Sequence, residues 1–393
     1  MEQKARTKEK HKMKGKRNFV SFLALAVILL ASLACGTSST VAPQPTKESD
    51  QDIVGASKPP VVTNTPETTK TIESPPTHTP TIIGLSRNNP FSCTDLVSAP
   101  NWDVQVIDIK RGEEAWQDIQ AANMFNESAP EGMEYLLVKI HAKSTYADSD
   151  DHSISGCDFD VTGDKLINYT CSMASVVEPD PHLDARLYSG GETEGWAAYL
   201  VAQNEGNLML VVDESYNFDS DAVRYIALND GATIDIPPDL ESIKTTDSGK
   251  NRNAPASRTE KVITEDWELL ITDVIRGDTV WEMVQEANQF NDPPKDGFEY
   301  IAVRIHVRYI GSEEKPTSID GSYFKSTGSA GILHDAPSIV DPSPQLDISL
   351  YPGGEYEGWI VVQASVGETN MMLVFEPIFD FSDKNKRFIS LEP

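Results

Sequence analysis

The sequence predicts an all-β protein: two tandem immunoglobulin-like antiparallel β-sandwiches, each with one short inserted α-helix. Three observations lead to this fold class. The chain of 393 residues lies on itself when it is shifted by 165 positions, most of each copy reads as short strands, and one segment in each copy has helical spacing. A chain of this length accommodates two or three domains rather than one.

The internal repeat is long and almost free of gaps. From Trp102 to Lys143, 16 of 42 positions are identical in the second copy, where this segment begins at Trp267. Two residues then drop out, and the shift becomes 163, so that Gly195-Trp196 meets Gly358-Trp359. A repeat of this length is a duplicated domain rather than one unit of a solenoid.

The domain boundaries follow from the repeat and from the composition around it. The segment that joins the two copies is polar and short, so we expect some freedom between the domains. The expected parts are a signal peptide at 1–34, a tether at 35–83, a first domain at 84–230, a linker at 231–248 and a second domain at 249–393.

The strands are predicted by period-two patterns. In "EYLLVKIHAK", which ends at Lys143, apolar and polar residues alternate from Val138 onward, and "EYIAVRIHVR" repeats this in the second copy. Such alternation is typical of a half-buried antiparallel strand. Each copy holds seven or more such short strands over roughly 130 residues, with turns between them, which indicates an immunoglobulin-like sandwich.

The helix is predicted by a different spacing. From Asp278 to Phe290 the apolar residues suit one helix face, and "NDPPKDG" ends the segment. We expect Trp281, Val284 and Phe290 to pack on the sheet. Asn288 and Asn291 lie near the end of the helix, where asparagine can bond free carbonyl groups.

The residues that recur in both copies are mostly aromatic residues and glycines, whereas most charged residues differ. We therefore interpret the repeat as a scaffold built twice, with function on loops or outer sheet faces. The repeated scaffold residues are Trp102, Trp116, Phe125, Tyr135, Trp196, Trp267, Trp281, Phe290, Tyr300 and Trp359.

The N-terminus has the order of a lipoprotein signal. Residues 1–17 hold eight Lys or Arg and two Glu, a net charge of +6, and an apolar run follows to "SLACG". Cys35 is the expected lipidation site, although Ser32 stands where leucine is usual. The rival interpretation, an uncleaved anchor, requires a longer apolar run of about 20 residues. Both interpretations place the remaining chain on the extracytoplasmic face of the cell membrane.

Composition limits the partners. The tether is rich in Thr, Pro and Ser, which cannot bury enough apolar area to fold. The net charge is -28, and it becomes -34 when the +6 of residues 1–17 is removed. An acidic surface repels nucleic acid and anionic lipid heads, so we expect no nucleic-acid partner and contact with the membrane only through the N-terminal lipid.

Three cysteines remain after Cys35, all in the first domain. In an oxidising compartment they predict one disulfide and one odd thiol. Cys157 and Cys171 flank a turn, so a bridge between them is easy, and it would add about 3 kcal/mol of stability by closing a short loop. A bridge from Cys93 to either of the other two stays open as an alternative. A metal site or a thiol nucleophile fits this spacing less well.

Other chemical interpretations are weaker than structural ones. His141 and His306 lie between cations on an outer strand face, which disfavours protonation or metal binding. The acidic pair Glu192 and Glu194, repeated as Glu355 and Glu357, reads as a solvated turn rather than a glycosidase pair. The loop around Asp148, Asp150 and Asp151 lacks the glycine and distal glutamate of a calcium loop.

Several of these motifs resemble a known family. "RGEEAW" with "NMFN", "EGMEYLLVKI", "SGGETEGW" and "NLMLVVDE", each with a partner in the second copy, resemble bacterial lipoprotein domains of unknown function with an immunoglobulin-like fold. That family is related to a mycobacterial immunoprotective extracellular antigen. The resemblance covers about three quarters of the chain, and it implies a β-sandwich at the cell surface without an established catalytic residue.

The sequence contains none of the usual nucleotide, hydrolase or metalloprotease motifs. We therefore expect a protein that is not an enzyme and that has no metal and no cofactor. Its expected role is a binding or adhesion module that presents two domains to an extracellular protein or glycan. The alternative is a structural envelope lipoprotein without a specific ligand.

Overall fold

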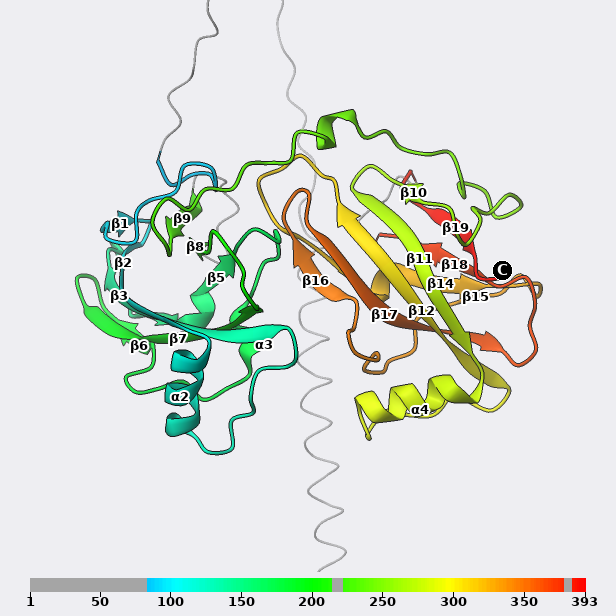
Figure 1. The fold of residues 1–393 in the computed structure, drawn as a ribbon, viewed down its shortest axis with the longest axis horizontal. Helices are drawn as coiled ribbons and strands as arrows, with labels where there is room; N and C mark the ends of the chain where they lie inside the picture. The colour runs from blue at the N-terminus through cyan, green and yellow to red at the C-terminus, as the bar shows by residue number, and fades with distance from the viewer. Residues whose placement is uncertain (1–82, 214–221, 378–383) are drawn as a thin grey trace, which may run out of the picture. The chain divides into compact units, whose positions relative to one another are not determined.

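The computed structural model describes residues 83–213, 222–377 and 384–393 (Figure 1). Pro75–Pro393 forms one compact unit, and both copies of the repeat lie within it. The fold is all-β, with antiparallel sheets and one inserted helix of ten residues in each copy. No helix within the described ranges has the length and hydropathy needed to cross a membrane.

Copy one, residues 84–230, forms a four-stranded sheet β1-β2-β3-β7, a pair β4-β6 and a three-stranded sheet β5-β8-β9. Its elements are β1 (Val97–Ser98), β2 (Trp102–Arg111), α2 (Glu113–Ala122), β3 (Met133–Ser144), β4 (His152–Ser155), η1 (Gly156–Asp158), β5 (Phe159–Thr162), α3 (Cys171–Ala174), β6 (Asp184–Leu187), β7 (Glu192–Ala202), β8 (Met209–Val212) and β9 (Arg224–Ala227).

Copy two, residues 249–393, repeats this plan with the sheets β10-β11-β12-β17, β13-β16 and β15-β14-β18-β19. A short 3-10 helix in the joining segment, η3 (Leu240–Ser242), precedes it. Its elements are β10 (Val262–Ile263), β11 (Trp267–Arg276), α4 (Asp278–Ala287), β12 (Phe298–Tyr309), β13 (Thr317–Asp320), η4 (Gly321–Tyr323), β14 (Phe324–Thr327), β15 (Leu333–His334), β16 (Asp347–Leu350), β17 (Glu355–Ser365), β18 (Met372–Phe375) and β19 (Arg387–Ser390).

The alternating pattern of β3 sets one face of the strand against the core. Leu136, Val138 and Ile140 are fully buried in the main apolar core, while Lys139 and His141 on the other face are half-buried. Each fully buried aliphatic side chain contributes roughly 1.5 to 3 kcal/mol through removal of apolar surface from water. The period-two prediction therefore identified the inward residues of this strand.

The inserted helix covers the outer face of the same sheet. Gly112 adopts a positive φ of 63° before α2. Two acidic residues occupy the first turn, where their negative charge interacts favourably with the helix dipole and stabilises the helix. Ala115 and Ile119 are buried against Tyr135 and Trp196. The first half of β3 is therefore buried on both faces, which explains why it is more apolar than the second half.

The helix is shorter than the sequence predicts, and the two repeated phenylalanines do not pack on the sheet. The helix α4 ends at Ala287 because Asn288 takes an extended backbone, with φ -156° and ψ 116°. The chain therefore leaves the helical path before Phe290, whose side chain is 84% exposed. Phe125 in copy one is 82% exposed for the same reason, since α2 ends at Ala122. The expectation of a scaffold role for these two residues was wrong.

The joining segment is more closely packed than its polar sequence predicts. Ala232 and Ile234 are buried in the cluster on the outer face of β8 and β9. The N–H of Ile234 donates to the carbonyl oxygen of Arg87 at 3.0 Å. The segment is therefore part of the folded unit for at least this stretch.

Candidate functional site

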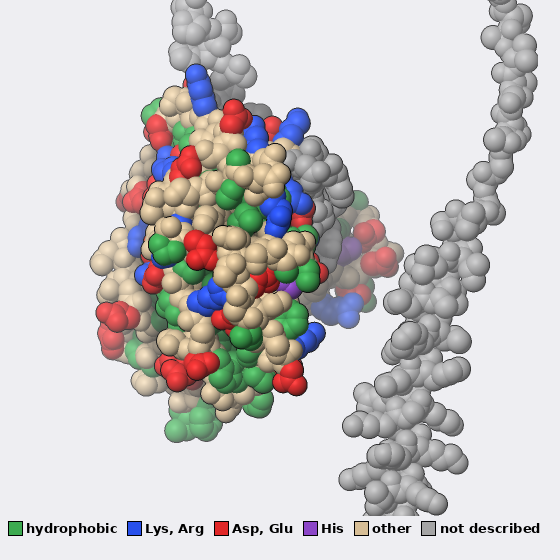
Figure 2. All heavy atoms as spheres, turned by 90° about the vertical axis from the view of Figure 1, so that its right-hand side faces the viewer, with side chains coloured by type: hydrophobic (Ala, Val, Ile, Leu, Met, Phe, Trp, Pro, Cys, Tyr) green, Lys and Arg blue, Asp and Glu red, His purple; other side chains and the backbone are tan. Residues whose placement is uncertain are grey.

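The loops that follow the two helices present exposed aromatic side chains. We name these segments, 123–127 and 288–292, the tip loops. The side chains of Phe125 and Phe290 are more than four-fifths exposed, and Met124 beside the first is 79% exposed. In Figure 2, hydrophobic side chains gather at the lower end of copy two, where Figure 1 draws α4.

A set of side-chain hydrogen bonds fixes the first tip loop. The Nδ2 of Asn126 donates to the carbonyl oxygens of Ile119 at 2.8 Å and Val177 at 2.9 Å. Its Oδ1 accepts from the N–H of Val177 at 3.0 Å. The buried Tyr135 donates its hydroxyl to the carbonyl oxygen of Glu127 at 2.9 Å. One asparagine therefore joins the end of the helix to a segment 51 residues further along the chain.

The second tip loop is fixed in the same way. The Nδ2 of Asn291 donates to the carbonyl oxygens of Val284 at 2.8 Å and Val340 at 2.9 Å, and its Oδ1 accepts from the N–H of Val340 at 2.9 Å. Tyr300 donates its hydroxyl to the carbonyl oxygen of Asp292 at 3.1 Å. The repeated asparagines and tyrosines thus maintain one loop geometry in both copies.

This arrangement suits binding rather than chemistry. An exposed apolar residue needs no special explanation when it stands alone, but a cluster of them marks a contact surface. Val177 is 53% exposed beside the first loop and Val340 is 42% exposed beside the second. A hollow of about 410 Å³ lies next to Phe125. Burial and the neighbouring Glu127 raise the pKa of Tyr135, so its hydroxyl stays a neutral donor.

The repeated glutamates form cross-strand ion pairs with the histidine and lysines of the neighbouring strand, between β3 and β7 in copy one. In copy one, Lys143 Nζ lies 2.9 Å from Glu192 and His141 Nε2 lies 3.5 Å from the same carboxylate, while Lys139 Nζ lies 2.5 Å from Glu194. The hydrogen bond from Lys143, with its charge, lowers the pKa of Glu192.

Copy two repeats this pairing across β12 and β17. His306 Nε2 lies 3.3 Å from Glu355, and Arg304 lies 2.8 Å from Glu357. The glutamates are therefore partners of the strand cations rather than an isolated acidic turn.

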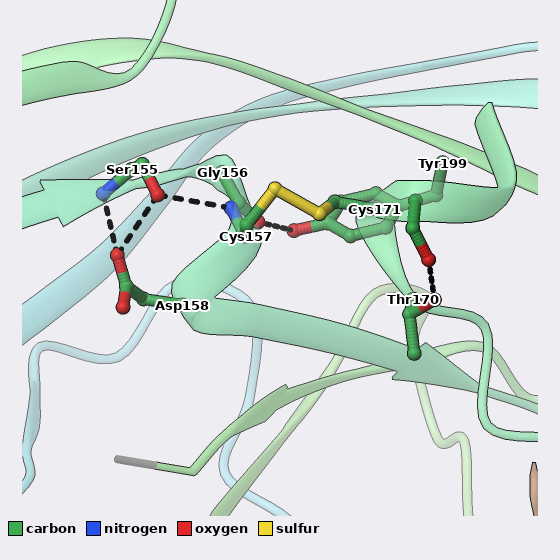
Figure 3. Close-up of a disulfide and its surroundings, with 8 residues drawn as sticks. Ser155, Gly156, Cys157, Asp158, Thr170, Cys171 and Tyr199 are labelled. Carbon is green, nitrogen blue, oxygen red and sulfur yellow. Dashed lines mark hydrogen bonds between the residues drawn. A yellow bond between two sulfur atoms is a disulfide. The ribbon is translucent and has the colours of Figure 1, made fainter. Parts of the chain in front are cut away.

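The structure pairs Cys157 with Cys171, one of the pairings that the sequence left open (Figure 3). Cys93 is left as a half-exposed thiol. The bridge ties the 3-10 helix η1 to the start of α3, and Ser155 caps η1 by accepting from the N–H of Cys157. Cys35, the expected lipidation site, lies outside the described residues.

Two of the three aspartates in the loop around Asp148 form ion pairs with side chains of the same chain. Asp148 lies 2.9 Å from His152 Nε2, and this hydrogen bond lowers the pKa of Asp148. Asp151 lies 2.6 Å from Arg186. Among the described residues, no group of three or more His, Cys, Asp or Glu side chains has metal-binding geometry.

Two buried glutamates were missed by the sequence analysis. Glu205 accepts from the N–H of Lys165 at 2.6 Å and from the hydroxyl of Tyr169 at 2.9 Å, and burial raises its pKa. Its counterpart Glu368 accepts from the N–H of Ala330 at 3.0 Å. The two glutamates align in the repeat, but their polar surroundings resemble an exposed turn. Each stabilises a loop and is buried, at 2% and 6% exposure.

The repeated aromatic residues other than the phenylalanines occupy two kinds of position. Trp102 and Trp267 lie in the main core, while Trp196 and Trp359 lie in the clusters beneath the helices. Tyr135 and Tyr300 are buried in those same clusters, and Trp116 and Trp281 on the helices are partly buried.

No protein-family model matches the chain, and no curated protein matches it. Solved structures show partial likeness. The protein ycdA of Bacillus subtilis, named as a candidate lipoprotein, is 12% identical with a TM-score of 0.28, over 35% of this chain and 39% of that one. The chain thus spans about two fifths of that protein.

Two further structures have similar values. The secreted protein MPT63 of Mycobacterium tuberculosis is 9% identical with a TM-score of 0.24, over 35% of this chain and 98% of that one. An uncharacterised β-sandwich protein of Clostridium difficile is 12% identical with a TM-score of 0.23, over 38% of this chain and 99% of that one. At these values no family is assigned, and no function is carried across.

Proposed function

We propose that this chain is a lipid-anchored, extracytoplasmic and non-catalytic binding protein that uses its two tip loops to contact another protein. One observation carries the proposal. Phe125 and Phe290 recur at the same position in both copies, yet both are exposed, so packing of the core does not account for them. The same four hydrogen bonds hold each loop in one geometry, which lowers the entropy lost on binding.

The negative charge near the tip loops limits the kind of protein surface that we expect them to bind. The sequence around the tip loops includes Glu127, Glu131, Asp292 and Asp296, and the whole chain carries a net charge of -28. An apolar tip with an acidic rim complements an apolar pocket with a basic rim on a protein surface. Two such tips on one chain increase the apparent affinity when the partner offers more than one site.

Photo-cross-linking on intact cells tests this function. A photoreactive phenylalanine analogue would replace Phe125 in one chain and Phe290 in another, with Val366, which is 67% exposed, as the control position. We expect both tip positions, but not Val366, to cross-link to the same partner. Excess purified chain should displace that partner, whereas a chain with Phe125→Ser and Phe290→Ser should not.

The alternative outcome is equally definite. If neither position yields a partner that purified chain displaces, the tip loops are not a binding site and the structural envelope role is favoured. Lipid anchoring is tested separately, by incorporation of a labelled fatty acid into the chain and its loss in Cys35→Ala. Incorporation that persists in Cys35→Ala would contradict the proposed anchor.

A further inference from the structure

The two copies of the repeat meet through a short β-bridge. Ile167 of copy one lies antiparallel to Leu350 at the end of β16. The N–H of Tyr351 donates to the carbonyl oxygen of Leu166 at 2.8 Å, and the N–H of Asn168 donates to that of Ser349 at 2.9 Å. We call 166–168 the bridging segment of copy one, and we call β16 with the turn after it the receiving edge of copy two.

Side chains bury this contact. The bridging segment contributes Leu166 and Ile167, which are 7% and 8% exposed, and the receiving edge contributes Tyr351, which is 1% exposed. The guanidinium carbon of Arg87 lies 4.3 Å from the centroid of the Tyr351 ring, and Arg87 Nε lies 2.7 Å from Glu314. The contact is therefore apolar at its centre, with one buried cation at its side.

The close approach requires glycine in the turn of the receiving edge. A Cβ at Gly354 would lie 2.7 Å from the carbonyl oxygen of Leu166, and a Cβ at Gly353 would lie 2.5 Å from Pro237. Both distances are shorter than real Cβ contacts. The bridging segment therefore accounts for Gly354, whereas Gly353 faces Pro237 of the joining segment and has a positive φ of 92° that itself favours glycine.

Copy one has the same receiving edge, but nothing in the described residues covers it. Within those residues β6 pairs only with β4. Tyr188, the counterpart of Tyr351, is 66% exposed, and a Cβ at Gly190 would have no atom within 4 Å. The glycines fit the turn itself, since Gly190 has a positive φ of 79°, but Tyr188 is an exposed aromatic residue that the fold of copy one does not bury.

Copy two has the same bridging segment, and it is also uncovered. The counterparts of Ile167 and Asn168 are Ile332 and Leu333, which are 52% and 47% exposed. The turn before them has the same shape, because Gly331 donates its N–H to Gly328 at 3.0 Å as Leu166 does to Gly163 at 2.9 Å. Leu166 and Gly331 both have positive φ, 61° and 74°.

We propose that a second copy of this chain binds head to tail, with the bridging segment of copy two in one chain paired to the receiving edge of copy one in the next. Ile332 then lies opposite Leu187, and the N–H of Tyr188 donates to the carbonyl oxygen of Gly331. The contact joins two different surfaces, so it does not close on itself and allows growth beyond two chains. This inference does not depend on the tip loops.

Charge sets the conditions for this association. The net charge of -28 makes neighbouring chains repel one another, whereas the two uncovered surfaces are apolar at their centres. Salt screens repulsion between exposed charges and leaves apolar burial in place. Association should therefore strengthen as ionic strength rises.

A cysteine pair provides the most direct test. Ile167 and Leu350 lie between two flanking backbone hydrogen bonds, and in antiparallel strands such pairs have Cα atoms about 4.5 Å apart, which suits a disulfide. The full chain with Cys35→Ser and Cys93→Ser would carry Ile332→Cys and Leu187→Cys together. We expect a ladder of linked chains on a non-reducing gel that collapses under reductant, and no ladder from either single cysteine.

Sedimentation of the chain without added cysteines gives an independent measurement. The sedimentation coefficient should rise with concentration, and Tyr188→Asp or Ile332→Asp should weaken association at least about tenfold, since each removes a central apolar contact. Both side chains are exposed, so folding should be preserved. Phe125→Ser with Phe290→Ser should leave association unchanged, which separates this surface from the tip loops.

Three results would overturn the proposal. They are a cysteine pair that links no more chains than the single cysteines, a species that stops at two chains, or a sedimentation coefficient that is the same at every concentration and in both aspartate variants.

Discussion

Replacement of Asn126 by Asp isolates the hydrogen bonds that hold the first tip loop. The change swaps one NH2 group for an oxygen and keeps the shape of the side chain. Asn126 donates to the carbonyl oxygens of Ile119 and Val177 at 2.8 and 2.9 Å. A carboxylate cannot donate, so each carbonyl oxygen would face a negatively charged oxygen instead of an N–H.

The magnitude follows from those two bonds. Each contributes about 1 kcal/mol net, and the two partly desolvated acceptors left without a donor add about 1 kcal/mol more. We therefore expect Asn126→Asp to lower the free energy of unfolding by about 3 kcal/mol at neutral pH. Protonation of the new carboxyl in acid restores one donor and recovers about 1 kcal/mol.

The matched control is Asn123→Asp. Oδ1 of Asn123 accepts one hydrogen bond, from the N–H of Phe125 at 3.1 Å, and aspartate accepts it equally well. Its free energy of unfolding should stay within about 0.5 kcal/mol of the parent, as for ordinary surface changes. The assay is urea denaturation followed by tryptophan fluorescence, since Trp116 lies on α2. Equal losses in the two variants, or a parental midpoint for Asn126→Asp, would refute the reasoning.

Three other perturbations have defined outcomes. Cys157→Ser should lower the free energy of unfolding by about 3 kcal/mol, because the bridge closes a loop with a sequence separation of 14; reductant should destabilise the parent and leave the variant unchanged in urea denaturation. Burial raises the pKa of Asp341 to about 7, so its stabilising contribution is complete below about pH 4 and is lost as pH rises through 7, at most about 4 kcal/mol. Asp341→Asn stays neutral and still accepts from the N–H of Val361. The melting temperature of this variant should therefore fall less between pH 4 and 8 than that of the parent chain. The same dependence of melting temperature on pH in both chains would contradict this. Gly354→Ala should destabilise the chain by about 1 to 3 kcal/mol more than the equivalent Gly191→Ala, since its Cβ meets the backbone of the other copy at 2.7 Å; equal melting temperatures would exclude that contact.

The alternation of apolar and polar residues in β3 predicted the sandwich, and the helical spacing before Asn288 predicted its helix. Both predictions succeeded because the spacing of apolar residues follows directly from which side chains are buried. Phe290 continued the helical spacing, so it was predicted to pack on the sheet. The helix ends at Ala287, however, and the end depends on the hydrogen bonds of Asn291 to Val340, a residue 49 positions away. A local pattern does not contain that information.

The contact between the copies was beyond prediction for a related reason. Tyr188 and Tyr351 have the same identity and the same place in the repeat, yet one is 66% exposed and the other 1%. Which of the two equivalent surfaces is covered depends on the position of the neighbouring copy. The sequence around the two tyrosines does not indicate which of them is buried. The buried Glu205 was missed because glutamate beside glycine and asparagine is most often exposed in a turn.

Leu166 makes the two copies thermodynamically dependent on one another. Its φ of 61° lies in the left-handed region, which costs a leucine about 1 to 2 kcal/mol and costs a glycine very little. The leucine side chain packs in a cluster that joins copy one and the joining segment to Tyr351 of copy two, so its burial offsets that cost and part of that burial depends on copy two. If copy one were cut free at the linker, Leu166→Gly would relieve the same backbone strain but lose less buried surface, so it should destabilise the separate copy less than the intact chain. Stabilities measured on the separate copies would therefore not add up to the stability of the whole chain.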